Sequence, residues 1–245
     1  MKKLLVMTGV LMALGAPVFG APGLNLSWNT CTLGPGLANL NDACTAEFGA
    51  PYVLVCSLNP PDMPNFVAAA GIVKVRVQPD LGGVPAVGWW HYETGGCRAG
   101  KLSAAVDFQV SGPFDCPDPW DNQSSGTPNY VVDPTWTDAS SIQWIASRPT
   151  GTHLDPTVAS DWYLIKLSIV KSAPNTACPG CLNPACLLFD FCRLQEPAGG
   201  LDITLTTPAI RNYVTWQGGG TGTYECPGAT PTLKGTWGSV KALYR

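Results

Sequence analysis

Alternation of apolar and polar positions along the chain predicts a protein built from strands. The clearest cases are 66–78, where three valines at every second position alternate with polar residues, and 101–110, where every second residue is apolar. A period of two places one set of side chains on one face of a strand. The same reasoning predicts further strands over 24–28, 52–58, 86–93, 130–132, 141–147, 162–170, 187–194, 201–206 and 212–217.

The spacing of these strands predicts the fold class. The chain shows neither long helical periodicity nor a strand–helix–strand rhythm, which disfavours a parallel α/β sheet. We expect an all-β fold, namely a disulfide-stapled β-sandwich of jelly-roll type, with a short C-terminal helix after Thr236. The predicted limits are 21–196 for the sandwich domain and 197–245 for a small C-terminal subdomain packed on it.

The N-terminus has the pattern of a secretory signal peptide. Two lysines precede an apolar stretch over 4–19, and small residues occupy positions 18 and 20. The apolar stretch is shorter than the roughly 20 residues that a membrane span requires. We expect cleavage of 1–20 and a mature chain that starts near Ala21 without a transmembrane segment. Such a chain is secreted, at the cell surface or in the periplasm.

The composition of the chain reduces the classes of binding partner to be considered. Loss of the two lysines of the signal changes the formal net charge from −3 to −5, and only 13% of the residues are charged. This mild acidity argues against nucleic acid, which selects clustered Lys and Arg. With 27 glycines, 23 prolines and nine tryptophans, the composition is typical of a turn-rich β protein rather than a disordered one.

Ten cysteines in an exported chain predict disulfides. Four of them lie in the stretch 178–192, with spacing C-x2-C-x4-C-x5-C, which lacks the two C-x2-C pairs of a zinc ribbon. Its first pair does not open a helix after a strand, as a redox motif would. Proximity in the sequence predicts the pairs Cys31–Cys44, Cys97–Cys116 and Cys178–Cys186, with Cys181–Cys226 joining the C-terminal region to this stretch. Cys56–Cys192 is the remaining pair and forms if the two strands are neighbours, while the sequence alone leaves the connectivity open.

Aromatic residues suggest one candidate ligand platform. If 86–93 is a strand, Trp89 and His91 share a face, with Tyr92 beside them and Trp120 as a further contributor. Carbohydrate-binding modules use such aromatic, polar surfaces. The alternative is that these aromatics belong to an ordinary core, where they are equally at home.

An acidic loop suggests a second candidate site. Asp115, Asp118 and Asp121 lie within seven residues, and oxygen ligands in a loop suit Ca²⁺. Their spacing matches no EF-hand, so solvated turn residues are the alternative. We expect no other cofactor.

Four stretches, SWNTC (27–31), CPGCLNPAC (178–186), YVTWQGG (213–219) and CPGATPTLKGTWGSVKALYR (226–245), resemble a group of uncharacterised exported bacterial proteins. The strand pattern of FVAAAGIVKVRVQPD, WYLIKLSIV and ACLLFDFCRLQ is similar to the jelly rolls of cohesins and carbohydrate-binding modules. The second resemblance implies a sandwich fold. Fold analogy transfers no activity.

The sequence therefore favours a secreted, non-enzymatic binding or structural module outside the cell or at its surface. Only two histidines are present, and no nucleophile elbow, P-loop or HExxH motif occurs. The expected partner is a polysaccharide or another surface protein. A carbohydrate-binding module is the first alternative, and an extracellular glycan-active hydrolase is the second.

Overall fold

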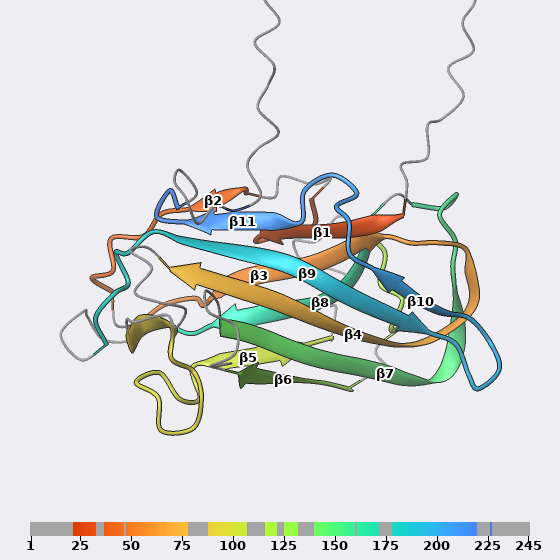
Figure 1. The fold of residues 1–245 in the computed structure, drawn as a ribbon, viewed down its shortest axis with the longest axis horizontal. Helices are drawn as coiled ribbons and strands as arrows, with labels where there is room; N and C mark the ends of the chain where they lie inside the picture. Colours follow the sequence, from red (N-terminus) through yellow and green to blue (C-terminus); the bar gives the residue numbers. More distant parts are fainter. Residues whose placement is uncertain are drawn as a thin grey trace, which may run out of the picture.

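The structure is a computed structural model that describes residues 22–32, 37–46, 48–77, 88–106, 116–121, 125–131, 140–159, 161–171, 178–219 and 226. The predicted signal peptide and C-terminal helix lie outside these residues. The described chain forms two β-sheets that pack face to face (Figure 1). The predicted all-β sandwich is confirmed.

The smaller sheet has four antiparallel strands. In spatial order they are β1 (Gly23–Trp28), β3 (Tyr52–Asn59), β8 (Trp162–Ile169) and β5 (Leu102–Ala105). Strand β3 is central and almost wholly buried, as its apolar residues on both faces predict.

The larger sheet has seven strands and faces the viewer in Figure 1. Six of them follow in the order β2 (Asn39–Leu40), β11 (Tyr213–Trp216), β9 (Ala185–Gln195), β4 (Met63–Val77), β7 (Ser140–Leu154) and β6 (Ser125–Val131). The seventh, β10 (Asp202–Leu205), pairs with the far end of β9. Strands β10 and β11 come from the predicted C-terminal subdomain, so residues 202–216 are part of the sandwich.

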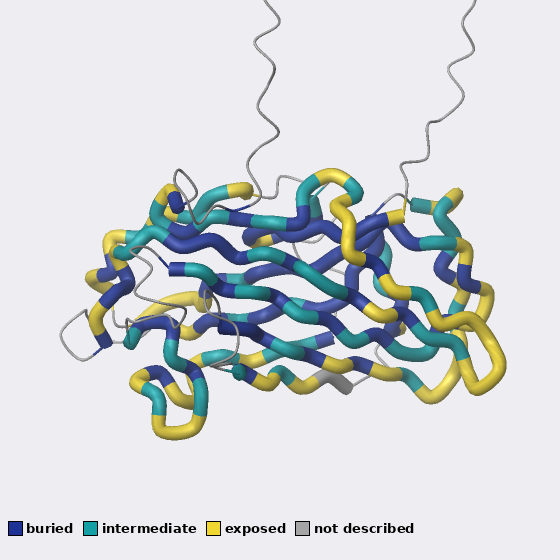
Figure 2. Tube along the Cα trace, in the orientation of Figure 1, coloured by how far each residue is buried: buried dark blue, intermediate teal, exposed yellow. Residues whose placement is uncertain are grey.

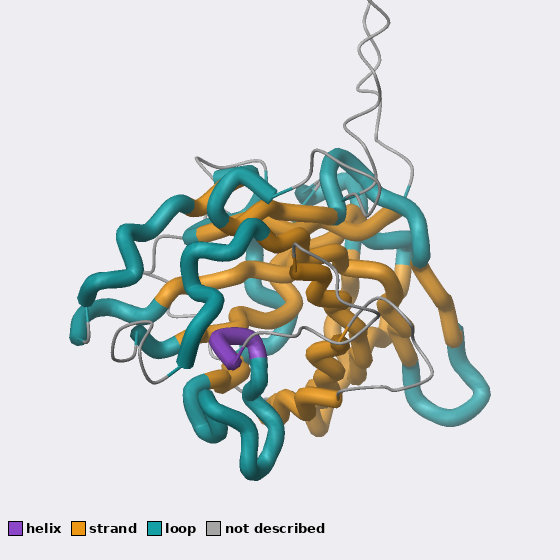
Figure 3. The backbone as a smooth tube through the Cα atoms, turned by 60° about the vertical axis from the view of Figure 1, so that its left-hand side comes forward, coloured by secondary structure: helices purple, strands orange, loops and turns teal. Residues whose placement is uncertain are grey.

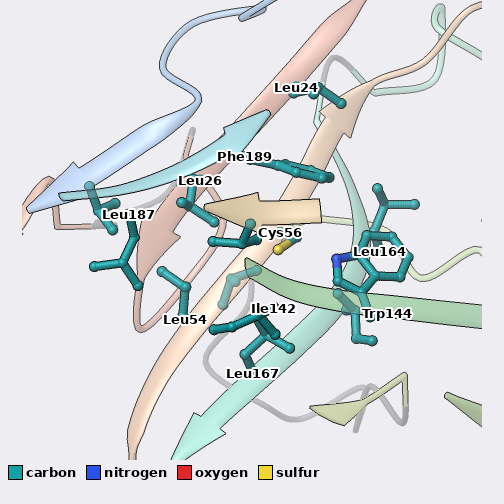
Figure 4. Packing of buried hydrophobic residues seen from close by; sticks show 14 of the residues in the cluster. Leu24, Leu26, Leu54, Cys56, Ile142, Trp144, Leu164, Leu167, Leu187 and Phe189 are labelled. Carbon is teal, nitrogen blue, oxygen red and sulfur yellow. The ribbon is translucent and has the colours of Figure 1, made fainter. Parts of the chain in front are cut away.

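The core fills the space between the two sheets. Leucines of β1, β3 and β8 meet Ile142 and Trp144 of β7 and Phe189 of β9, and all of them are buried (Figure 4). The predicted alternation in β4 is confirmed, because Val73 and Val75 are fully buried while Lys74 lies half-buried on the opposite face. Each such aliphatic side chain contributes about 1.5–3 kcal/mol on burial.

Strand β1 closes one side of the sandwich. Its free edge binds the segment before β11, with the amides of Leu24 and Leu26 donating to the carbonyls of Thr207 and Arg211, both at 2.8 Å. Asn25 supports the junction from a fully buried position, where its side-chain oxygen accepts the amide of Ile210 at 2.9 Å. The same strand thus joins the four-stranded sheet to the edge of the seven-stranded one.

The predicted strand over 86–93 is wrong for 88–93, the part of it that the structure describes. Residues 88–93 form a 3₁₀ helix, Gly88–Trp90, and a following turn, seen as the only purple segment in Figure 3. Bulky residues on both sides of the segment suggested a strand. In the structure these residues belong to the 3₁₀ helix and the segment after it, where Trp89, Trp90 and Tyr92 are all buried.

Four disulfides are present, and each differs from the predicted pairing. They are Cys31–Cys116, Cys44–Cys181, Cys97–Cys178 and Cys186–Cys226, with Cα–Cα distances of 5.4–6.1 Å. The predictions Cys31–Cys44, Cys97–Cys116, Cys178–Cys186 and Cys181–Cys226 joined cysteines by proximity in the sequence. The fold instead brings together segments 40 to 137 residues apart. The stretch 178–186 is bound covalently to three different parts of the chain.

The predicted Cys56–Cys192 disulfide is also wrong in this structure, where both cysteines are unpaired and buried. Cys56 lies on β3 and Cys192 on β9, so their strands belong to different sheets instead of being neighbours in one sheet. The Cys56 sulfur lies among core leucines in Figure 4. Burial raises the pKa of both thiols, which keeps them protonated and unreactive.

We expect thiol titration to distinguish four disulfides and two free thiols from the five disulfides predicted by the sequence. The native protein should react with no equivalent of a thiol reagent, and the unfolded, unreduced protein with two, because only Cys56 and Cys192 carry free thiols. Peptide mapping without reduction should recover the four pairs above. Cys56→Ala should lower the count in the unfolded protein to one. A fifth disulfide-linked peptide would contradict the expectation.

Candidate functional site

The predicted aromatic platform is buried. Trp89, Tyr92 and Trp120 are 2%, 6% and 0% exposed, so none of them can stack on a ligand. Trp89 instead packs against Trp216 of β11, with ring centroids 6.2 Å apart. Trp120 donates its indole N–H to the carbonyl of Leu164 at 2.6 Å. The platform prediction is wrong, and the core alternative describes these residues.

A buried arginine, which sequence reasoning did not identify, organises this cluster. Arg98 is 1% exposed, and its guanidinium carbon lies 3.6 Å from the centroid of the Trp89 ring. It donates to the hydroxyl of Tyr92 at 3.3 Å and to the carbonyl of Val170, the residue after β8. Burial lowers the pKa of Arg98 and raises the pKa of Tyr92 to about 12. The cluster ties the turn after the 3₁₀ helix to the four-stranded sheet.

His91 is the predicted ligand residue that keeps some exposure. Its Nδ1 lies 2.6 Å from a carboxylate oxygen of Glu93, and about a quarter of the side chain is exposed. This contact holds the imidazole against its own turn. His91 does not line the hollow described below.

The acidic loop does not assemble a calcium site from its described residues. Asp118 accepts the backbone amide of Trp120 at 2.8 Å, which is the geometry of an Asx turn. Asp121 is exposed, with φ of 55°, and Asp115 lies outside the described residues. Within the described ranges no group of three or more His, Cys, Asp or Glu could hold a metal ion. Calcium binding stays a prediction.

The outer face of the seven-stranded sheet is a more accessible surface. Its side chains alternate with the core-facing ones along β4, β7 and β9, as Figure 2 shows by the change between buried and less buried positions. The strand register aligns these outward positions in rows across the sheet. One row runs Phe191, Ile72, Gln143, Asn129, and the next runs Arg193, Ala70, Ile145, Thr127.

A hollow of about 190 Å³ lies where these rows reach β6 and β7. Its lining consists of Thr127, Asn129, Gln143, Trp144 and Ile145. Asn129 lies opposite Gln143, and Thr127 opposite Ile145, which is 57% exposed. Trp144 is also part of the lining, although it is only 3% exposed. The hollow thus combines two amides, a hydroxyl and an apolar side chain.

Gly71 makes room for the tryptophan beneath this face. It lies opposite Trp144, and a Cβ built at Gly71 would lie 2.3 Å from the indole ring. Any larger residue must displace that ring. On β4, Ala70 lies opposite Ile145 and Ala68 occupies the next outward position, so the surface on this side of Ile145 stays low.

Charged side chains on the outer face pair with one another. Lys74 lies 2.7 Å from Asp190, and Arg193 binds both carboxylate oxygens of Asp202. These interactions raise the pKa of Arg193 and lower the pKa of Asp202. The hollow itself is lined by uncharged residues.

Sequence reasoning missed this site because strands β6 and β7 were predicted separately, at 130–132 and 141–147. The signal was available in part, since an amide and an isoleucine at positions 143 and 145 share one face of a strand. Their partners on β6 became visible only with the register.

Comparison with models of known protein families gives no match, and no characterised protein matches the sequence. The resemblances proposed from the sequence therefore stay predictions. Among the described residues, no helix is long and apolar enough to span a membrane.

We expect Trp89→Ala to act on stability. Removing the ring leaves a cavity and exposes the buried guanidinium of Arg98, so the free energy of unfolding should fall by about 3–5 kcal/mol. Chemical denaturation monitored by circular dichroism measures this loss. Asn129→Ala, on the exposed face, should change stability by less than about 0.5 kcal/mol. Full stability of the Trp89 variant would contradict the buried cluster.

We expect Gly71→Ala to destabilise the sandwich by about 1–3 kcal/mol, because the new methyl group overlaps the Trp144 ring. Thermal or urea unfolding measures the effect. The double variant Gly71→Ala/Trp144→Phe should lose less than the sum of the two single losses, since the smaller ring relieves the overlap. Strict additivity would show that the two residues do not interact.

Proposed function

We propose that the protein is a secreted, non-enzymatic binding module outside the cell or at its surface, and that it binds through the outer face of the seven-stranded sheet. One observation supports this choice above the others. Among the described residues, this face carries an uncharged hollow, while the aromatics first considered for binding are core. The four disulfides are typical of an oxidising compartment, in agreement with the predicted signal peptide.

The histidine contacts support a non-enzymatic role. His91 is held by Glu93, and His153 lies 2.7 Å from Asp62. Neither histidine is in the lining of the hollow, which also contains no carboxylate or thiol. The hollow offers hydrogen bonds and apolar contact, which serve recognition, and its lining has no general base that could activate the Thr127 hydroxyl.

The outer face of the four-stranded sheet is less accessible over β1 and β3, which supports the choice of the other sheet. Ser27, Val55 and Ser57 on the four-stranded sheet are fully buried. Outward positions of the seven-stranded sheet, in contrast, include Ile145, more than half exposed, and exposed Thr127 and Asn129. A rigid sheet that presents such side chains provides a preorganised surface, which lowers the entropic cost of binding.

A binding assay with a matched pair of variants tests this function. Fluorescently labelled mature protein should bind intact cells or extracellular material of its source, and Ile145→Arg should reduce that binding at least tenfold, because a bulky charge obstructs the hollow. Ser103→Arg, at an exposed position of β5 on the other sheet, is the control and should bind like the wild type.

Two results would contradict the proposal. One is equal binding by the wild type and Ile145→Arg when circular dichroism shows both folded. The other is release of reducing ends from a panel of polysaccharides by the purified protein, which would favour the hydrolase alternative.

A further inference from the structure

We infer that the hollow between β6 and β7 binds one sugar unit of a neutral polysaccharide, whose chain crosses the strands toward Phe191. This inference rests on the function proposed above and specifies the ligand of the same surface. It depends on the hydrogen-bonding capacity of the hollow, on its lack of charge and on the direction of the residue rows across the sheet.

The two amides of the hollow match sugar hydroxyl groups. Asn129 and Gln143 are directly opposite on neighbouring antiparallel strands, a separation of about 5 Å between Cβ atoms. Each amide carries one acceptor oxygen and two N–H donors, and a hydroxyl group both donates and accepts. Thr127 adds a hydroxyl from the adjacent row. Adjacent hydroxyls on one ring can therefore bind to both strands together.

The apolar part of the hollow suits the ring of a sugar. Ile145 is 57% exposed, and the low side chain of Ala70 lies beside it on β4. The C–H groups of a pyranose ring can pack on this aliphatic patch while its hydroxyls reach the amides. Ile145 then gains burial that the free protein does not give it.

Charge excludes an acidic ligand. The hollow has no ionisable side chain, and on the same face Lys74 and Arg193 are paired with Asp190 and Asp202. A ligand carboxylate would lose hydration without gaining a cation, which is costly. An uncharged polyhydroxyl compound has no such cost.

The strand register indicates the path of the polysaccharide chain across the outer face of the sheet. From Asn129 the row continues through Gln143 and Ile72 to Phe191, one residue on each of β6, β7, β4 and β9. Three strand spacings of about 4.8 Å separate its ends by roughly 14 Å. The row offers amides at one end and a half-buried aromatic ring at the other. An extended oligosaccharide can contact all four residues.

A peptide strand is a poorer occupant of this part of the sheet. Strand β6 is the last strand of the seven-stranded sheet, and Pro128 occupies its middle. Proline has no N–H to donate, so it interrupts the hydrogen-bond ladder that an added strand would need.

Affinity electrophoresis and titration calorimetry test the inference. The probes are soluble β-glucan, xylan and mannan as neutral polysaccharides, with polygalacturonate as the acidic one. We expect at least one neutral polysaccharide to bind and polygalacturonate not to bind. Asn129→Ala and Gln143→Ala should each weaken binding about tenfold, the effect of losing one or two hydrogen bonds.

Two further variants test where the polysaccharide lies on the sheet. Phe191→Ala should weaken binding of long oligosaccharides more than of a disaccharide, because only the long ones reach β9. Gln195→Ala, an amide on the same face in a different row, is the control and should bind like the wild type. Circular dichroism and the count of free thiols verify folding of every variant.

The outcomes separate the two proposals. If cells bind the protein through Ile145 but no neutral polysaccharide does, the ligand class is wrong and the binding function stands. If polygalacturonate binds instead, the charge argument fails. Equal losses for Gln195→Ala and Asn129→Ala would place the site elsewhere. If cells do not bind and no polysaccharide does, both proposals fail.

Discussion

The packing around Trp216 supports the cysteine-rich end of the sandwich. Its ring contacts Trp28, Tyr52, Trp89 and Trp90, with centroids 4.9–6.2 Å away. Its indole N–H donates to the carbonyl of Cys181, within the stretch bound by three disulfides. This tryptophan thus connects the disulfide-bonded stretch 178–186 to strands of both sheets. The three disulfides reduce the conformational entropy of the unfolded chain. The aromatic cluster supplies the packing contacts that stabilise the folded arrangement.

The two faces of the seven-stranded sheet have different roles, because successive side chains along each strand point to opposite faces. On β7, Ile142 and Trp144 are buried in the core, while Gln143 and Ile145, which alternate with them, lie on the outer face at the hollow. A one-residue slip of this strand would exchange the two sets. The close contact between Gly71 and Trp144 fits only one register, so it helps to fix both the core and the binding face.

The extent to which sequence predicts this protein depends on the range of the interaction concerned. Strands such as β4 and β8 were predictable, because the alternation of neighbouring residues reports directly on burial. Disulfide pairing was not, since Cys44 and Cys181 are 137 residues apart in the sequence and are brought together only by the arrangement of the strands. Trp89 illustrates a further limit, because a tryptophan beside charged residues has the same local pattern whether its ring covers a ligand or a buried arginine. The hollow required the register between Asn129 and Gln143, which no single strand contains.

The unpaired cysteines bear on how the chain matures in an oxidising compartment. Even among the eight paired cysteines roughly a hundred connectivities are conceivable, and two additional thiols multiply the ways to mispair. Cys56 and Cys192 reach the structure reduced, so the sandwich must enclose them before an oxidant or a thiol-exchange partner does. Burial between the two sheets therefore protects these thiols from disulfide exchange in the folded protein. Hydrophobic packing thus helps to keep the four crosslinks in one connectivity.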